Sequence, residues 1–258
     1  MTVDLLTNTA YGYPRGEKRR IAPRRLACIH ITANPRTPPA TAQQERDYAN
    51  RDGSNGPSAH VYIGRTADRV DAIDTAYAAW SNGVLRNPKL TVPGVSEVVA
   101  LAASGHNPNE DYLREYEICG RNPDYPITSD QEMEVADQIA ADSLATGLPI
   151  ERATVHLHSD LDTVNRPNCP VPASQAERFV ARIISAALDE RDRLELIALR
   201  AQVARLEAIV NAQTLTLTDK DAMIAGLRED VTEVVAWGKR LQGFGGAILA
   251  TDPPEWVL

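Results

Sequence analysis

The sequence of 258 residues lacks a long hydrophobic run. No stretch approaches the roughly 20 apolar residues needed to cross a bilayer. The N-terminus MTVDLLTNTAYGYPRGEKRR also lacks the order of charge, apolar core and small-residue cleavage site that marks a signal peptide. We therefore expect a soluble protein without a transmembrane segment or a secretion signal. An apolar content of 43% is still sufficient for a hydrophobic core.

Cysteine is scarce as well. The three cysteines, Cys28, Cys119 and Cys169, cannot all pair with one another, and their spacing does not suggest a disulfide framework. We expect free thiols or metal ligands.

Basic residues are fewer than acidic ones, and the formal net charge is -8. This balance argues against nucleic acid as the main partner, because binding to phosphates requires a clustered basic face. The one basic cluster, residues 18–25, is short and precedes a strand. We interpret it as a solvated edge rather than a binding patch, although bacterial wall polymers are anionic.

Strands and helices alternate along the first 188 residues. Helix signals include Thr128 or Ser129 as an N-cap and Gly147 as a stop signal. Within residues 84–108 we expect a short helix at 95–103, and the rest of this segment is typical of an insertion. The remaining pattern predicts strands at 26–31, 58–65, 70–73, 112–120 and 153–158 and helices at 41–51, 129–146 and 173–188. Such alternation predicts an α/β domain.

A heptad pattern follows this domain. Apolar residues stand seven apart at Leu196, Val203, Val210, Leu217, Ile224 and Val231, and Leu199, Leu206, Leu227 and Val234 fill most of the alternating positions. The pattern predicts a coiled coil in which Gln213 and Lys220 interrupt the second seam, as residues that fix register or oligomer state do. One long helix folded back on the preceding domain is the alternative. The expected division is an arm at 1–25, a catalytic domain at 26–188, a coiled-coil helix at 189–236 and a Gly- and Pro-rich tail at 237–258.

Potential metal ligands cluster between residues 154 and 170, in TVHLHSDLDTVNRPNCP. His156 and His158 lie in a short strand, and a loop of about ten residues can bring Cys169 back to them. The best candidate for a third ligand is His30, at the end of a buried strand. Three protein ligands leave a fourth zinc position open for water, which is typical of a hydrolytic site. Glu117 lies within another strand, where a carboxylate is costly to bury without a purpose or partner.

Six short motifs occur in the order that one family shows. They are IHIT, SAHVYIGR, AAWSNG, YEICG, PITSDQ and HSDLDTVNRPNCP. Through them residues 26–188 resemble the type 2, zinc-dependent N-acetylmuramoyl-L-alanine amidases, which include phage endolysins and cell-wall recycling amidases and share their fold with peptidoglycan recognition proteins. The resemblance implies a central mixed β-sheet flanked by helices, here followed by the long coiled-coil helix.

The resemblance also implies roles for individual residues. His30, His158 and Cys169 match the zinc ligands, with one Zn²⁺ per catalytic domain. Glu117 matches the acidic residue that acts on the attacking water or the tetrahedral intermediate. A zinc ion polarises the scissile carbonyl, and a carboxylate can carry the proton to the leaving amine. His156 is the alternative to His158 as a ligand, and the H-S-D match favours His158.

The sequence departs from the family pattern at two places. Pro167 stands where many members have an oxyanion lysine, and Arg166, one step earlier, is the candidate for that role. Ser81 stands where the family's tryptophan motif has a histidine, so a substrate contact could be missing.

The expected substrate contacts are His60, Trp80 and Asn168. His60 matches a family histidine that we interpret as a structural or cleft residue, Trp80 lies in the tryptophan motif, and Asn168 lies in the loop before the cysteine.

The expected function is hydrolysis of the amide between N-acetylmuramic acid and L-alanine in bacterial peptidoglycan. We expect a phage lysin that waits in the host cytoplasm before release to the cell wall and forms a homo-oligomer through its coiled coil. A non-catalytic peptidoglycan-binding module and a virion-associated structural protein with an amidase-like domain are the alternatives, with a recycling amidase as the nearest enzymatic rival.

Overall fold

The computed structural model describes residues 17–18, 20–32, 41–49, 59–79, 81, 85–121 and 123–245. The chain divides into two compact units, residues 1–195 and residues 196–258. No helix among the described residues is long and apolar enough to span a membrane.

The first unit is built around a five-stranded sheet with the order β4-β3-β6-β2-β7. Four strands run parallel, and β4 pairs antiparallel with β3 at one edge. The strands are β2 (Arg25–Ile31), β3 (Val61–Ile63), β4 (Arg69–Asp71), β6 (Tyr112–Ile118) and β7 (Val155–Leu157). The expected α/β fold with a mixed sheet is confirmed.

Strand β2 lies between β6 and β7, and all seven of its residues are buried. A nearly continuous apolar run is typical of a parallel strand that is covered on both faces. In the register of β2 with β6, His30 lies beside Glu117 and Cys28 lies beside Glu115. Because successive side chains alternate between the faces of a sheet, these four side chains share one face.

The opposite face carries the main hydrophobic core. Helices α3 (Ser129–Thr146) and α5 (Ala176–Gly245) pack there against β2, β3, β6 and β7. Helix α3 begins with a capping box between Thr128 and Gln131 and ends at Gly147, whose positive φ of 76° suits a residue without a Cβ. The N-cap and the stop signal expected from the sequence are therefore present.

Two smaller apolar clusters cover parts of the face that bears His30. Helix α1 (Ala42–Ala49) supplies one, and α2 (Val95–Ala103) supplies the other. Val95 and Val98 of α2 pack with Cys28 in that second cluster. The short helix expected at 95–103 is therefore present, and it builds core over the central strand.

The basic cluster before β2 forms ion pairs with buried acids. Arg20 pairs with Glu110, and Arg24 and Arg25 both pair with Asp111. Both carboxylates lie in the short 3-10 helix η1 (Pro108–Asp111) and are fully buried. Buried charges require partners, and the cluster supplies them. The Arg20 and Arg24 side chains remain 54% and 55% exposed, as expected of a solvated edge, whereas Arg25 is buried. Just upstream, β1 (Glu17–Lys18) pairs antiparallel with β5 (Tyr77–Ala78).

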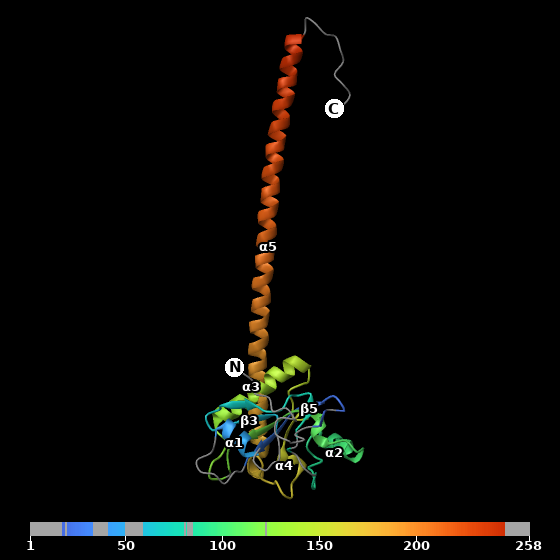
Figure 1. The fold of residues 1–258 in the computed structure, drawn as a ribbon, viewed down its shortest axis with the longest axis vertical. Helices are drawn as coiled ribbons and strands as arrows, with labels where there is room; N and C mark the ends of the chain where they lie inside the picture. Colours follow the sequence, from blue (N-terminus) through green and yellow to red (C-terminus); the bar gives the residue numbers. More distant parts are fainter. Residues whose placement is uncertain are drawn as a thin grey trace. The chain divides into compact units, whose positions relative to one another are not determined.

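Helix α5 is one continuous helix of 70 residues, preceded by the 3-10 helix η2 (Ala173–Gln175) (Figure 1). The sequence predicted a helix to 188 and a separate coiled coil from 189, and the structure contains no break between them. Within the second unit, the ten apolar heptad residues are between 47% and 67% exposed.

Candidate active site

Three possible metal ligands converge from segments far apart in the sequence. The side-chain donor atoms of His30, His158 and Cys169 all lie within 4.8 Å of one another, and all three residues are buried. The two histidines direct their Nδ1 atoms at each other across 2.8 Å. Within the described ranges, this group is the one cluster of three or more histidine, cysteine or acidic residues that could hold a metal ion.

The sheet explains why the two histidines meet. Strands β2 and β7 are parallel neighbours, with Ile29 beside Leu157. The next residue of β2 is His30, and the next residue after β7 is His158, which begins the short helix α4 (His158–Leu161). Parallel strands end at the same edge of a sheet, so both imidazoles reach the same place.

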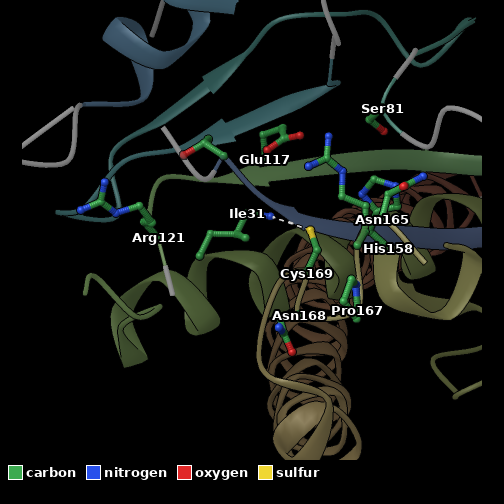
Figure 2. A pocket seen from close by; sticks show the side chains of 11 residues that line it. Ile31, Ser81, Glu117, Arg121, His158, Asn165, Pro167, Asn168 and Cys169 are labelled. Atoms are coloured by element: carbon green, nitrogen blue, oxygen red, sulfur yellow. Dashed lines mark hydrogen bonds between the residues drawn. The ribbon is translucent and has the colours of Figure 1, made fainter. Parts of the chain in front are cut away.

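Backbone hydrogen bonds bring Cys169 back to this edge. The Ser159 N–H donates to the Cys169 carbonyl at 2.9 Å, and the Cys169 N–H donates to the Arg166 carbonyl at 3.2 Å. The sulfur then accepts the backbone N–H of Ile31 at 3.4 Å, the bond drawn as a dashed line in Figure 2. The loop therefore returns the thiol to the end of β2.

The donor set fits a zinc ion. Imidazole nitrogen and cysteine sulfur are the ligands that zinc prefers, and three of them leave a position for water. Burial raises the pKa of the Cys169 thiol to about 12, the nearby Glu117 carboxylate adds to the rise, and the Ile31 N–H and Arg166 oppose it. A divalent cation would favour the thiolate instead, since metal binding and thiol deprotonation are coupled.

His156 lies outside this group. Its Nδ1 accepts a hydrogen bond from the Tyr112 hydroxyl at 2.6 Å, and its Nε2 donates to the Pro93 carbonyl at 2.8 Å. Burial lowers its pKa to about 4, so the ring is neutral. With both nitrogens engaged, His156 is a core residue in this structure. His158 faces His30 because the regular strand ends at Leu157.

An open pocket of about 380 Å³ leads to the cluster. Its wall includes Glu117, Arg166, Asn168 and two of the possible metal ligands, His158 and Cys169. Figure 2 shows Glu117 on the sheet side of this pocket, with Asn168 on the loop that carries Cys169. The other residues that line the pocket are Ile31, Thr32, Ser81, Arg121, Asn165 and Pro167.

Glu117 is the carboxylate with the most unusual surroundings in this pocket. Its Oε2 atom is buried without a hydrogen-bond partner among the described residues. Burial raises its pKa to about 8, the buried Glu45 carboxylate adds to the rise, and the positive charge of Arg166 opposes it. A carboxyl group with a pKa near neutrality can both accept and release a proton at working pH.

Arg166 is exposed on the pocket wall. Its positive charge partly opposes the rise in the pKa values of both Glu117 and Cys169. Asn168 is also exposed, and its Oδ1 accepts the Ala173 N–H at 3.4 Å.

Two further residues at the site were not predicted from the sequence as functional. Ser81 lies 3.1 Å from the His30 Nε2 atom and donates a hydrogen bond to the buried Glu115 carboxylate. The sequence marked Ser81 only as a departure and did not single out Glu115. The signal that could have identified Glu115 is its place two residues before Glu117, on the same strand face.

His60 does not line the pocket. It is fully buried: its Nδ1 accepts the Glu115 N–H at 3.0 Å and its Nε2 donates to the Tyr77 carbonyl at 2.8 Å. Contact between His60 and substrate stays a prediction, and the structure shows a role in holding the backbone at Glu115. Trp80 lies outside the described residues.

A family model described as N-acetylmuramoyl-L-alanine amidase matches residues 20–172, more than half of the chain. Among curated protein sequences, none matches at a significant level.

Several solved structures resemble the chain. The PlyG catalytic domain has a TM-score of 0.50 and 18% identity over 73% of this chain and 93% of that chain. The structure of PlyL has a TM-score of 0.46 and 20% identity over 71% and 97%. The N-acetylmuramoyl-L-alanine amidase LysC from Clostridium intestinale URNW has a TM-score of 0.43 and 14% identity over 69% and 95%. At such identities the likeness concerns the fold alone.

Proposed function

The chain belongs to the N-acetylmuramoyl-L-alanine amidase family and is an enzyme that acts on peptidoglycan, and we propose how its residues cleave the bond between N-acetylmuramic acid and L-alanine. The observation that carries the proposal is the convergence of the donor atoms of His30, His158 and Cys169 beside a pocket that Glu117 also lines. The Glu117 Oε2 atom has no hydrogen-bond partner among the described residues. A binding module does not require such a combination of metal donors and a proton carrier.

We assign the two histidines and Cys169 as the residues that hold one zinc ion. When bound, zinc would polarise the scissile carbonyl and lower the pKa of the attacking water. The buried positions of the three side chains keep the donor atoms close together before any ion arrives. The Ile31 N–H directed at the sulfur stabilises the charged form of Cys169.

Glu117 is the proton carrier in this proposal. Its carboxylate accepts a proton from the attacking water and then delivers that proton to the nitrogen of the departing L-alanine. The group can do so because its pKa lies near neutrality and its Oε2 atom has no competing partner among the described residues.

Arg166 is the candidate for stabilising the developing oxyanion. It lines the pocket with Glu117, and its guanidinium carries a fixed positive charge. Replacing Arg166 with Gln should lower kcat more than replacing it with Lys, because Lys retains the charge. Equal losses in both variants would favour a role in packing instead. Asn168 on the same wall is the proposed contact for the substrate's polar groups, and Trp80 and His60 stay candidates for contacts near it.

The direct test compares two buried cysteines. Cys169→Ser should remove both the bound zinc and the hydrolysis, whereas Cys119→Ser should retain both because Cys119 lies outside the donor group. The measurements are zinc content per chain and new L-alanine amino termini released from purified peptidoglycan. A wild-type protein that binds peptidoglycan but holds no zinc and releases no termini would contradict the proposal and favour a binding module.

We further propose that this amidase is a phage or prophage lysin that is made in the host cytoplasm and reaches the wall at lysis. The support is that α5, the last helix of the amidase unit, continues without a break into the second unit as a long helix. Expression in a bacterial cytoplasm should leave cells intact until the membrane is permeabilised, and the turbidity should then fall. Unchanged turbidity after permeabilisation, with an enzyme active on the purified wall of the same cells, would argue against lysis as the role.

The second unit supports a further proposal, that two copies of the chain pair through α5. The ten heptad residues form an exposed apolar stripe, and burying such a stripe drives coiled-coil formation. In a parallel, in-register pair, Gln213 meets Gln213 and the two amides can hydrogen-bond, while Lys220 meets Lys220 and the long side chains can carry the two charges out to solvent. In an antiparallel pair, Gln213 and Lys220 would each face apolar positions, where an unmatched polar group is costly.

The pairing is testable with two leucines of similar exposure. Leu206 lies on the stripe and Leu215 lies off it, at 54% and 68% exposure. By sedimentation, Leu206→Glu should shift the protein towards monomer, and Leu215→Glu should sediment like the wild type. A wild type that is monomeric at about 100 μM, or equal behaviour of both variants, would overturn the pairing.

A further inference from the structure

A chain of two hydrogen bonds connects His30 to a carboxylate outside the pocket. The His30 Nε2 atom lies 3.1 Å from the Ser81 hydroxyl, and the same hydroxyl donates to Glu115 Oε2. All three side chains are buried. These hydrogen bonds begin at the Nε2 side of the imidazole. The Nδ1 atom on the other side of the ring faces His158.

The direction of these bonds follows from the chemistry of the three groups. An ionised carboxylate only accepts hydrogen bonds, so the single hydroxyl proton of Ser81 is used on Glu115. The Ser81 oxygen can then only accept from His30. The proton of the neutral imidazole must therefore lie on Nε2, which leaves the lone pair on Nδ1, the atom directed at the ligand cluster.

We propose that Ser81 and Glu115 are positioning residues that hold His30 in the Nε2–H form and so present its Nδ1 atom as a metal donor. The inference rests on the proposed zinc site. Ligating histidines commonly donate their second ring N–H to a carboxylate, and such partners influence metal affinity. In this protein Ser81 lies between the histidine and the carboxylate, and we call the three residues His30, Ser81 and Glu115 the relay.

The fold holds Glu115 firmly in place. Its backbone N–H donates to His60 Nδ1 at 3.0 Å, and its carbonyl accepts the His60 N–H at 3.0 Å. Strand β6 pairs on its other side with β2, where Glu115 lies beside Cys28. The buried His60 is thus part of the support for the carboxylate.

His156 provides a contrast within the same molecule. Its Nε2–H also has a fixed acceptor, the Pro93 carbonyl, but the Tyr112 hydroxyl occupies its Nδ1 lone pair. At His30 the hydroxyl lies on the Nε2 side, and Nδ1 points to the ligand cluster. The two histidines thus differ in which ring nitrogen contacts a hydroxyl group, and only His30 keeps its Nδ1 lone pair for a metal.

The test uses the full chain and three variants. Ser81→Ala and Glu115→Gln interrupt the chain of bonds, and Tyr112→Phe is the matched control, because it removes a buried hydroxyl from the other histidine. Zinc affinity is measured by competition with a chromophoric chelator. The tautomer of His30 is measured in the metal-free protein by ¹⁵N NMR of the imidazole ring, and thermal unfolding checks that each variant is folded.

We expect wild type and Tyr112→Phe to bind zinc equally, and Ser81→Ala and Glu115→Gln to bind it about 10- to 100-fold more weakly. Metal-free wild type should show the Nε2–H form of His30, and Ser81→Ala should show a mixture.

Two results would overturn the inference. If the wild type binds zinc and both variants match its affinity, the relay is irrelevant and the proposed function stands. If metal-free wild type carries the His30 proton on Nδ1, the relay is wrong whatever the metal content. A wild type without zinc affinity would instead reject the proposed zinc site and the relay together.

Discussion

One face of the five-stranded sheet meets α3 and α5 with apolar side chains, and the other face carries histidines and carboxylates from the same strands. In β6, Tyr116 and Ile118 belong to the main core, whereas Glu115 and Glu117 lie on the opposite face with His30. Because side chains alternate along a strand, one residue packs in the core and stabilises the fold, while the next lies on the face that carries the candidate active site. Variants on the two faces should affect different measurements.

Glu117→Gln on the chemical face should have the largest effect. Loss of a proton carrier lowers kcat by about 10²- to 10⁴-fold, while zinc content and folding should stay near those of the wild type. Steady-state release of L-alanine termini measures the effect, with Glu134→Gln, a partly buried partner of Arg69, as the control. Retention of more than a tenth of the activity in Glu117→Gln would remove Glu117 from the mechanism.

Phe179→Ala on the apolar face should act on stability alone. Phe179 of α5 is fully buried in the main core, and truncation of such a side chain costs about 3–5 kcal/mol. Urea denaturation should show this loss in the free energy of unfolding, while the folded fraction keeps its zinc affinity. A weakened zinc affinity in folded Phe179→Ala would show that the two faces are coupled.

The pH dependence of the free energy of unfolding should show the separate contributions of Glu117 and His156. The raised pKa of Glu117, about 8, means that the folded protein binds more protons than the unfolded chain between pH 4.5 and 8. The free energy of unfolding therefore falls as the pH rises through this window. His156, with its pKa lowered to about 4, acts in the opposite direction, but only as the pH falls below about 6.5.

Between pH 6.5 and 8 the Glu117 contribution should therefore be visible. In metal-free protein, the wild type should lose about 1–2 kcal/mol relative to Glu117→Gln over this interval. Urea denaturation with a chelator present measures the difference. Parallel pH profiles for the two proteins would mean that the carboxyl group is not held in its neutral form.

Tyr112→Phe should have the smallest effect. It removes the hydrogen bond to His156 and leaves a buried ring nitrogen without its donor, which costs about 1–2 kcal/mol. The loss should appear in urea denaturation without a change in zinc affinity. A change in zinc affinity would place His156 closer to the metal site than its hydrogen bonds indicate.

The sequence predicted the elements whose signals are local. The capping box at Thr128, the stop at Gly147 and the short helix at 95–103 depend on neighbouring residues and occur in the structure. The end of β7 was harder to predict, because the strand pattern continues through His158 while the backbone turns into α4 at that residue. That turn explains why His156 and His158, expected on one strand face, have different surroundings.

Features that depend on distant partners were missed. The sequence pattern of 84–108 did not reveal the apolar surface that Cys28 and Tyr112 offer to α2. The Ser81 to Glu115 bond joins residues 34 positions apart, and no local pattern marks it. The zinc ligands could be proposed because their residue types are rare and because six motifs occurred in order, whereas the relay consists of common residue types.

The ion pairs of the basic segment set a lower limit on how far the enzyme can be shortened. Cutting the chain just before Leu26, at the expected end of the N-terminal arm, would remove Arg20, Arg24 and Arg25 and strip their cations from the buried Glu110 and Asp111. Uncompensated buried charge is strongly destabilising. A minimal, independently folding amidase should therefore retain Arg20, the residue at which the family match begins. The basic segment from Arg20 to Arg25 belongs to the catalytic unit.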